Sequence, residues 1–243
     1  MSNTLITVAP TGAETAKADC PQLPTTLSEL VETAVACEAA GASLIHIHIR
    51  DSDHQPSLDA VLLRETVLAV REQTSLVIQL STGGSVHDPL EKRLTVLDAE
   101  PDSCSLTCGT TNFGDDVFLN PYPFMAQLYQ LAQEREIVPE FELFDLGHVA
   151  ALRRLIDAYG LPFGGKVHVD FVTGVPGGMP GTPAALLVGI QARPAEVTSW
   201  AAPGPGRGHL TTPAPRQAAG RGPPGVGKPW GPRSKNGARC GMT

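Results

Sequence analysis

Short runs rich in β-branched residues alternate with longer helical segments along the first 200 residues of the chain. Seven strands are expected, at residues 5–9, 44–49, 76–80, 104–108, 141–144, 166–172 and 197–200. Helices are expected between them, at residues 27–39, 58–71, 88–97, 123–135, 148–159 and 183–191. The first follows Thr26 and Glu29, which are spaced as a capping box. This order is typical of repeated βα units around a parallel sheet.

Polar or glycine-rich clusters follow nearly every expected strand, at residues 11–14, 46–51, 81–84, 107–112, 145–147 and 174–178. A (β/α)8 barrel collects its chemistry at the carboxyl ends of all its strands, whereas an open doubly wound sheet uses one crevice. The distribution therefore favours an α/β fold of the (β/α)8 TIM-type. Because only seven strands are recognisable, we expect an incomplete barrel that lacks the eighth strand and the final helix.

The composition changes after Trp200. Residues 201–243 contain seven Lys or Arg and no Asp or Glu, and they are dense in Pro and Gly. Such a composition favours neither helix nor strand and predicts disorder. We therefore expect a barrel domain at residues 1–200 and a disordered tail at residues 201–243.

The whole chain of 243 residues has a net charge of -7, which gives no attraction to nucleic acid or to an anionic membrane. Small molecules are the expected partners. Its five cysteines form no CxxC pair, as expected in a reducing compartment. The N-terminus lacks signal-peptide features, and no apolar run approaches the length of a membrane span. A cytoplasmic location is therefore predicted.

The most specific local pattern is His46 and His48 in the second expected strand, where residues 45, 47 and 49 are all Ile. Alternate side chains of a strand point to the same face, so the two imidazoles should converge. Imidazole is a common zinc ligand, and we favour a metal site. The alternative is a pair of hydrogen-bonded core histidines.

Several carboxylates are weaker candidates. Glu14 follows the first strand, where it could bind substrate, orient a base or ligate metal, or simply be a solvated loop residue. Glu140 and Glu142 share one face near the fifth strand, so they could point into the barrel or lie at an exposed strand end. His168 and Asp170 repeat the alternation, as further ligands or as core hydrogen-bonding groups.

Two glycine-rich loops could contact a ligand. Ser81, Thr82, Gly83 and Gly84 lie between a strand and a helix, where hydroxyl and backbone N–H groups can hold a carboxylate or a phosphate. The loop at residues 174–181 is long enough to be a lid. Both loops could instead be purely structural turns.

Together, ordered motifs over residues 5 to about 212 resemble the β-keto acid cleavage enzyme family. They are TGAET from Thr11, HIHIR from His46, STGG from Ser81, GTTNFGDD from Gly109, VPEFE from Val138, GVPGGM from Gly174 and GRGH from Gly206. Members are (β/α)8 barrels, usually homo-oligomers, that bind one Zn2+ ion. They convert a small β-keto acid and the CoA thioester acetyl-CoA into acetoacetate and a new acyl-CoA ester. One such reaction is 3-keto-5-aminohexanoate cleavage in lysine degradation.

The resemblance implies roles for individual positions. His46 and His48 would be the zinc ligands, and Glu14 and Glu142 would be catalytic. Substrate binding would fall to Ser81, Thr82, Gly83 and Gly84, together with Thr107.

The C-terminal part departs from the family pattern. Family members carry an Arg, a Glu that is the third zinc ligand and an Asp on the eighth strand, and the corresponding positions here are Pro224, Lys228 and Pro229. A third protein ligand would then be missing. We attribute this to a shift of the reading frame near residues 201–213, and we expect metal binding and activity to be impaired. The alternative origin of this C-terminal part is a natural truncated homologue with an interaction tail. The alternative functions are an amidohydrolase-like metal hydrolase and a catalytically dead barrel that acts as a binding or subunit module.

Overall fold

The computed structural model describes residues 5–203 and 209–210. Its framework is one sheet of eight strands in the order β1-β2-β5-β6-β9-β10-β11-β12. These strands are β1 (Thr7–Val8), β2 (Leu44–Ile47), β5 (Val77–Leu80), β6 (Ser103–Thr107), β9 (Val138–Leu143), β10 (Val167–Phe171), β11 (Val197–Pro203) and β12 (His209–Leu210). Neighbours from β1 to β11 are parallel, whereas β12 is antiparallel to β11.

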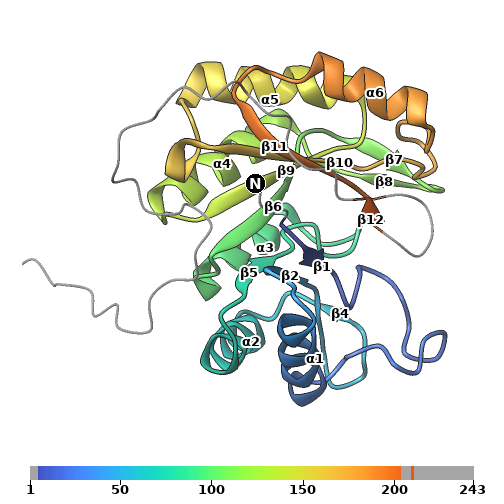
Figure 1. The fold of residues 1–243 in the computed structure, drawn as a ribbon, viewed down its shortest axis with the longest axis vertical. Helices are drawn as coiled ribbons and strands as arrows, with labels where there is room; N and C mark the ends of the chain where they lie inside the picture. The colour runs from blue at the N-terminus through green and yellow to red at the C-terminus, as the bar shows by residue number, and fades with distance from the viewer. Residues whose placement is uncertain (1–4, 204–208, 211–243) are drawn as a thin grey trace, which may run out of the picture.

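Six α-helices cover the sheet, with α1 and α2 near one end of the strand order and α5 and α6 near the other (Figure 1). They are α1 (Leu27–Ala39), α2 (Ala60–Gln73), α3 (Leu90–Thr95), α4 (Tyr122–Glu134), α5 (Leu146–Tyr159) and α6 (Pro183–Ala192). There are also two short 3-10 helices, η1 (Val96–Ala99) directly after α3 and η2 (Phe163–Gly165) after α5. The predicted capping box is present, because the Thr26 side chain accepts from the Glu29 N–H and the Glu29 carboxylate accepts from the Thr26 N–H.

All seven predicted strands and all six predicted helices are present, and the prediction of an incomplete barrel is confirmed. No strand within the described ranges pairs with the outer edge of β1, and no parallel strand follows β11 there. Most bounds differ from the prediction by one or two residues. The largest differences are that β9 begins three residues earlier than predicted and that β11 continues three residues further, and the second predicted strand stops at Ile47.

Two short antiparallel pairs were not predicted. β3 (Ile49–Arg50) pairs with β4 (Pro56–Ser57), and β7 (Thr111–Phe113) pairs with β8 (Asp116–Phe118). Strands of two or three residues are too short for an alternating pattern to be recognised. Both pairs follow a strand of the main sheet, so they add to its carboxyl edge.

The two faces of the sheet differ in chemistry. Ile45, Ile78 and Phe141 are fully buried in the apolar clusters beneath the helices. On the alternate positions, strand pairing sets His46 beside Gln79, Gln79 beside Ser103, Ser105 beside Glu140, Glu140 beside His168, and His168 beside Ser199. Because branched apolar residues normally fill this face of a barrel, a polar layer there indicates a functional site.

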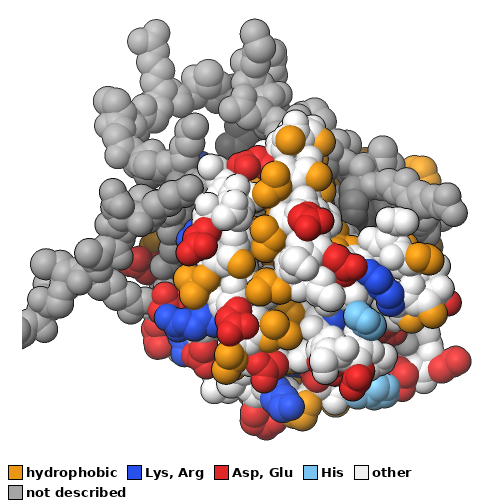
Figure 2. All heavy atoms as spheres, turned by 90° about the horizontal axis from the view of Figure 1, so that it is seen from below, with side chains coloured by type: hydrophobic (Ala, Val, Ile, Leu, Met, Phe, Trp, Pro, Cys, Tyr) orange, Lys and Arg blue, Asp and Glu red, His pale blue; other side chains and the backbone are white. Residues whose placement is uncertain are grey.

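The outer surface of the described residues is mixed in polarity. Figure 2 shows apolar side chains in a stripe among charged ones on the lower face of Figure 1, where α1 and α2 lie. Val35 of α1 and Val61 and Leu68 of α2 are among the exposed apolar residues. None of the described helices has the length and apolar character needed to cross a bilayer.

Candidate active site

His46 and His48 converge as predicted. The Nε2 atoms of the two rings lie 3.1 Å apart, and the ring centroids are 5.0 Å apart. The backbone N–H of His48 donates to Thr11 Oγ1 at 3.0 Å, which fixes the loop after β1 against this strand. Burial, followed by the nearby His46 and Arg50, lowers the pKa of His48 well below its ordinary value. A neutral imidazole with an available lone pair is the form that binds a metal.

The histidines open onto a cavity of about 340 Å³ at the carboxyl edge of the sheet. Three carboxylates also line it, from Glu140, Glu142 and Asp170. Phe113 of β7 and Phe144 after β9 supply apolar walls. A cavity of this size, with a few convergent polar groups, suits a small polar ligand.

Glu140 and Glu142 both point into the cavity, because β9 starts at Val138 and includes both residues. The alternative of an exposed strand end is therefore wrong, and the extra strand length is the reason. Burial by itself would raise the pKa of Glu140, but the bond from His168 Nε2 to Glu140 Oε2 at 2.9 Å, with the charge of His168, lowers it. His168 also bonds Ser199 Oγ through Nδ1 at 2.6 Å, so it is a core hydrogen-bonding residue.

Glu142 has a different environment. Thr107 donates its hydroxyl to Glu142 Oε2 at 2.5 Å. Burial is the largest influence and raises the pKa of Glu142, although His46, the Thr107 hydroxyl and Arg93 act in the opposite direction. Two carboxylates on one strand whose pKa values are moved in opposite directions are a common arrangement for acid–base chemistry.

Asp170 provides a first testable prediction. Its buried Oδ1 has no hydrogen-bond partner within the described part of the chain. Burial, and then the charges of Glu140 and Glu142, raise the pKa of Asp170 well above 3.8. Ionised Asp170 therefore destabilises the fold, and its protonation relieves that penalty. We expect Asp170→Asn to raise the free energy of unfolding at neutral pH by on the order of 1 kcal/mol.

The gain in stability from Asp170→Asn should be smaller at low pH than at neutral pH. A carboxyl group with a raised pKa favours the folded state at low pH, and this contribution is lost as pH rises from about 3.8 toward the folded pKa. The stabilisation by Asp170→Asn should thus shrink when urea unfolding is repeated at about pH 4 with a chelator present. Exposed Asp115→Asn serves as the control and should change little. An equal gain at both pH values would show that ionisation of Asp170 is not the cause.

The STGG loop is fixed by hydrogen bonds to β6 and within the loop, and its residues are not among those that line the large cavity. Thr82 is 1% exposed; its N–H donates to Ser105 Oγ at 3.2 Å and its hydroxyl to the Ser105 carbonyl at 2.7 Å. The backbone N–H and the hydroxyl of Thr82 are therefore both used in hydrogen bonds within the fold. The N–H of Gly83 donates to Ser81 Oγ at 3.1 Å. Gly84 has φ +59, and a Cβ there would collide with the Asp88 carboxylate.

Ser81 and Gly84 instead line a small neighbouring pocket of about 10 Å³ with His48 and Arg50. His48 lines both spaces, so it connects the loop to the large cavity. Glu14 is exposed and is not among the residues that line the large cavity, whereas Gly12 is. The predicted roles of Glu14, Ser81, Thr82, Gly83, Gly84 and Thr107 remain predictions.

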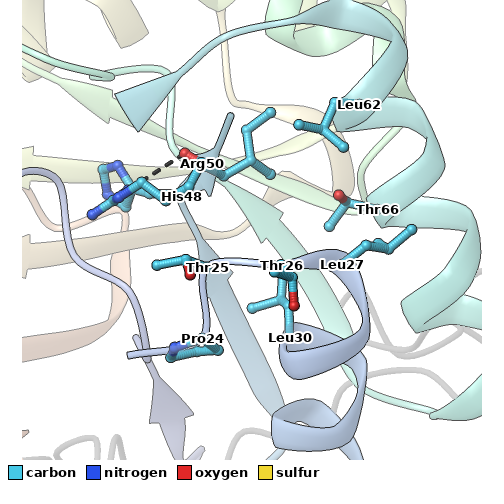
Figure 3. A pocket seen from close by; sticks show the side chains of 10 residues that line it. Pro24, Thr25, Thr26, Leu27, Leu30, His48, Arg50, Leu62 and Thr66 are labelled. Carbon is cyan, nitrogen blue, oxygen red and sulfur yellow. Dashed lines mark hydrogen bonds between the residues drawn. The ribbon is translucent and has the colours of Figure 1, made fainter. Parts of the chain in front are cut away.

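Arg50 organises the loop that follows β1. Its side chain is 4% exposed, and Nη2 donates to the carbonyl of Gly12 at 2.9 Å and more weakly to Thr11 and Thr15. Figure 3 shows a second small pocket beside it, lined by His48 and Arg50, by Pro24, Thr25, Thr26, Leu27 and Leu30, and by Leu62 and Thr66 of α2. The Arg at the end of HIHIR is therefore a structural partner of the TGAET motif.

Gln79 and Arg93 are two buried polar residues near the site that were not singled out from the sequence. Gln79 is fully buried in β5, and the signal that could have revealed it is a polar residue inside the apolar run VIQL. Arg93 is 2% exposed, and its guanidinium bonds backbone or amide oxygens of Thr82, Leu119 and Asn120. Such a bonding pattern depends on loops far apart in sequence and has no local signal.

Across residues 5–203 and 209–210, no group of three or more His, Cys, Asp or Glu side chains is arranged to hold a metal ion. The positions predicted to replace the third ligand and its neighbours, Pro224, Lys228 and Pro229, lie outside the described residues. Predictions about them stay predictions.

The fold and the site define an incomplete (β/α)8 barrel with a polar cavity at the carboxyl edge of its strands. The family model for the beta-keto acid cleavage enzyme matches residues 3–222. The chain belongs to the β-keto acid cleavage enzyme family.

Relatives of known function agree with this assignment. The 3-keto-5-aminohexanoate cleavage enzyme of Acetoanaerobium sticklandii is 35% identical over 198 residues, which are 81% of this chain and 72% of the relative. The 3-oxoadipate:acetyl-CoA acetyltransferase of Cupriavidus necator is 33% identical over 210 residues, 85% of this chain and 73% of the relative.

A solved structure supports the fold. The ternary complex of ObcA with a C4-CoA adduct and oxalate superposes with a TM-score of 0.58 at 22% identity, covering 64% of this chain and 38% of that chain. The present chain thus spans little more than a third of ObcA. At this identity the likeness concerns the fold alone.

Proposed function

We propose that this chain exchanges acyl groups between a small β-keto acid and acetyl-CoA, with a zinc ion held by His46 and His48. In the overall reaction the bond between the keto carbon and the CH2 group of R–CO–CH2–COO⁻ breaks. The R–CO group passes to the CoA sulfur, and the acetyl group takes its place on the CH2–COO⁻ fragment. The products are acetoacetate and R–CO–CoA.

The observation that carries the proposal is the facing pair of Nε2 atoms at the wall of the cavity. Two nitrogens bound to one tetrahedral zinc ion at about 2.0–2.1 Å are about 3.3 Å apart. The 3.1 Å separation of His46 Nε2 and His48 Nε2 fits two ligands of the same ion. When bound, zinc would polarise the keto oxygen and stabilise the negative charge that develops during bond exchange.

The remaining residues supply proton transfer and positioning. The raised pKa of Glu142 suits this carboxyl to exchange a proton with a bound keto acid, and the Thr107 hydroxyl on Oε2 holds it in place. Glu140 is held by the hydrogen bond from His168, and its lowered pKa favours the ionised form. Phe113 and Phe144 give the cavity apolar walls, which would favour the apolar part of a bound keto acid.

The proposal is tested on the full chain with zinc supplied. Purified protein is incubated with acetyl-CoA and either 3-keto-5-aminohexanoate or 3-oxoadipate, and acetoacetate and acyl-CoA products are measured by chromatography. Zinc content is measured on the same sample. We expect acetoacetate to form only when both substrates are present. Product formation without acetyl-CoA would indicate a hydrolase, and absence of both product and bound zinc would overturn the proposal for this chain.

A further inference from the structure

Gln79 lies between the two halves of the polar layer. It is fully buried in β5, where it pairs in register with His46 of β2 on one side and with Ser103 of β6 on the other. A buried amide must satisfy its hydrogen bonds locally, because no water reaches it. Its contacts therefore determine which atoms of the neighbouring side chains are donors and which are acceptors.

The orientation of the amide follows from its partners. Gln79 Nε2 donates to Ser103 Oγ at 3.0 Å, so the amide nitrogen faces β6. A hydrogen bond from the Gln79 side chain is also one of the influences that lower the pKa of Glu140, and it is consistent with this orientation because a carboxylate accepts. The amide oxygen is thereby turned toward His46, and Gln79 Oε1 lies 2.5 Å from His46 Nδ1.

The tautomer of His46 follows in turn. An amide oxygen can only accept a hydrogen bond, so His46 Nδ1 must carry a proton. The neutral ring then has its lone pair on Nε2, the atom that faces His48 Nε2 at 3.1 Å. A ring nitrogen is a metal ligand only when it is unprotonated, and the bond made by the other nitrogen decides which one that is.

We infer that Gln79 is a positioning residue that locks His46 in the Nδ1–H tautomer and aims its Nε2 lone pair into the cavity. The effect of Gln79 on metal binding rests on the proposed function, whereas the tautomer of His46 does not depend on it. A carboxylate or carbonyl oxygen usually supplies this bond to a metal-binding histidine, and here a neutral amide oxygen supplies it.

The test uses nitrogen-15 NMR of the histidine side chains in the metal-free full chain, slightly above neutral pH. Wild-type His46 should show a protonated Nδ1 and an unprotonated Nε2. Gln79→Met keeps the volume of the side chain but removes the acceptor, so the two tautomers of His46 should both become populated. Gln79→Glu keeps an acceptor at the same place and should preserve the wild-type tautomer, which separates the hydrogen bond from any general loss of packing.

Ser103→Ala is the matched control. It removes the other hydrogen-bond partner of the Gln79 amide but leaves the contact of Gln79 Oε1 with His46 Nδ1, so the His46 signals should not change. An unprotonated Nδ1 in the wild type, or unchanged His46 signals in folded Gln79→Met, would overturn the inference. If Gln79→Met does not fold, the wild-type tautomer and the Gln79→Glu spectrum decide: a changed tautomer in folded Gln79→Glu would refute it.

Zinc affinity separates this inference from the proposed function. Titration against a competing chelator should show a tenfold to hundredfold weaker affinity in Gln79→Met, roughly the effect of losing such a bond elsewhere. Wild-type protein that shows the expected tautomer but no zinc binding would overturn the zinc proposal and leave the tautomer inference standing. A Gln79→Met protein with mixed tautomers and wild-type zinc affinity would refute the positioning role.

Discussion

Arg93→Met is expected to lower the free energy of unfolding by about 2–4 kcal/mol. Arg93 Nε donates to the Thr82 carbonyl at 2.7 Å, Nη1 to the Leu119 carbonyl at 2.7 Å and Nη2 to Asn120 Oδ1 at 2.5 Å. The guanidinium carbon lies 4.8 Å and 4.5 Å from the ring centroids of Phe118 and Phe124. Methionine can keep the apolar contacts with these rings but leaves three oxygens without their donor.

Two opposing effects set the size of the change in the free energy of unfolding. Burial of the guanidinium is unfavourable and lowers the pKa of Arg93 to about 10, so removal of the charge recovers part of that free energy. Each buried acceptor that loses its donor costs about 1–3 kcal/mol. The bonds to the Thr82 carbonyl and Asn120 Oδ1 are buried and the bond to the Leu119 carbonyl is partly buried, so their combined loss outweighs the recovered desolvation and the net change is destabilising.

Guanidinium chloride unfolding measures the effect. Arg64→Met on the exposed side of α2 is the matched control and should change the free energy by less than about 0.5 kcal/mol. Hydrogen exchange should also quicken at the Thr82 N–H, because the carbonyl of the same residue loses its anchor. Unchanged stability of Arg93→Met would show that the three oxygens find other donors.

His46→Ala should weaken zinc binding and, with it, lower the formation of acetoacetate. Structural zinc sites with four ligands have binding free energies of about 10–16 kcal/mol, so one histidine accounts for about 2.5–4 kcal/mol. This corresponds to a dissociation constant weaker by roughly 70-fold to 850-fold. The loss should be large here because His46 and His48 are the two ligands proposed within the described residues.

Competition with a chelator measures the affinity, and the same sample is assayed for acetoacetate. His87→Ala removes an exposed imidazole from the same chain and should leave both properties unchanged. The melting temperature in the presence of chelator reports whether His46→Ala is folded. A folded His46→Ala protein that binds zinc with wild-type affinity would exclude His46 as a ligand.

The order and type of the main elements could be predicted because each strand and helix has enough residues to show its period. The run at 44–49 and the apolar run at 76–80 are long enough to be read as strands. The hairpins β3-β4 and β7-β8 could not be predicted, because strands of two or three residues carry no such pattern. Phe113 of β7 nevertheless forms a wall of the cavity.

Some features of the candidate site could likewise be predicted from the sequence, and others could not. The pairing of His46 and His48 followed from strand alternation alone, since both residues lie in one short segment. The position of Glu140 depended on where β9 begins, which the sequence placed three residues too late. The exposure of Glu14 and the engagement of both polar groups of Thr82 depend on distant partners, so the motif residues gave no indication of them.

By itself the sequence determined that a parallel, incomplete barrel forms and that two imidazoles face one side of it, because hydrophobic periodicity and strand alternation are local properties. Only the tertiary structure decided that Glu140, Glu142 and Asp170 line one cavity, that the Gln79 amide oxygen faces His46 Nδ1, and which loops Arg93 joins. These depend on burial and on hydrogen bonds between residues such as His46 and Gln79, whose strands come together only when the sheet has formed.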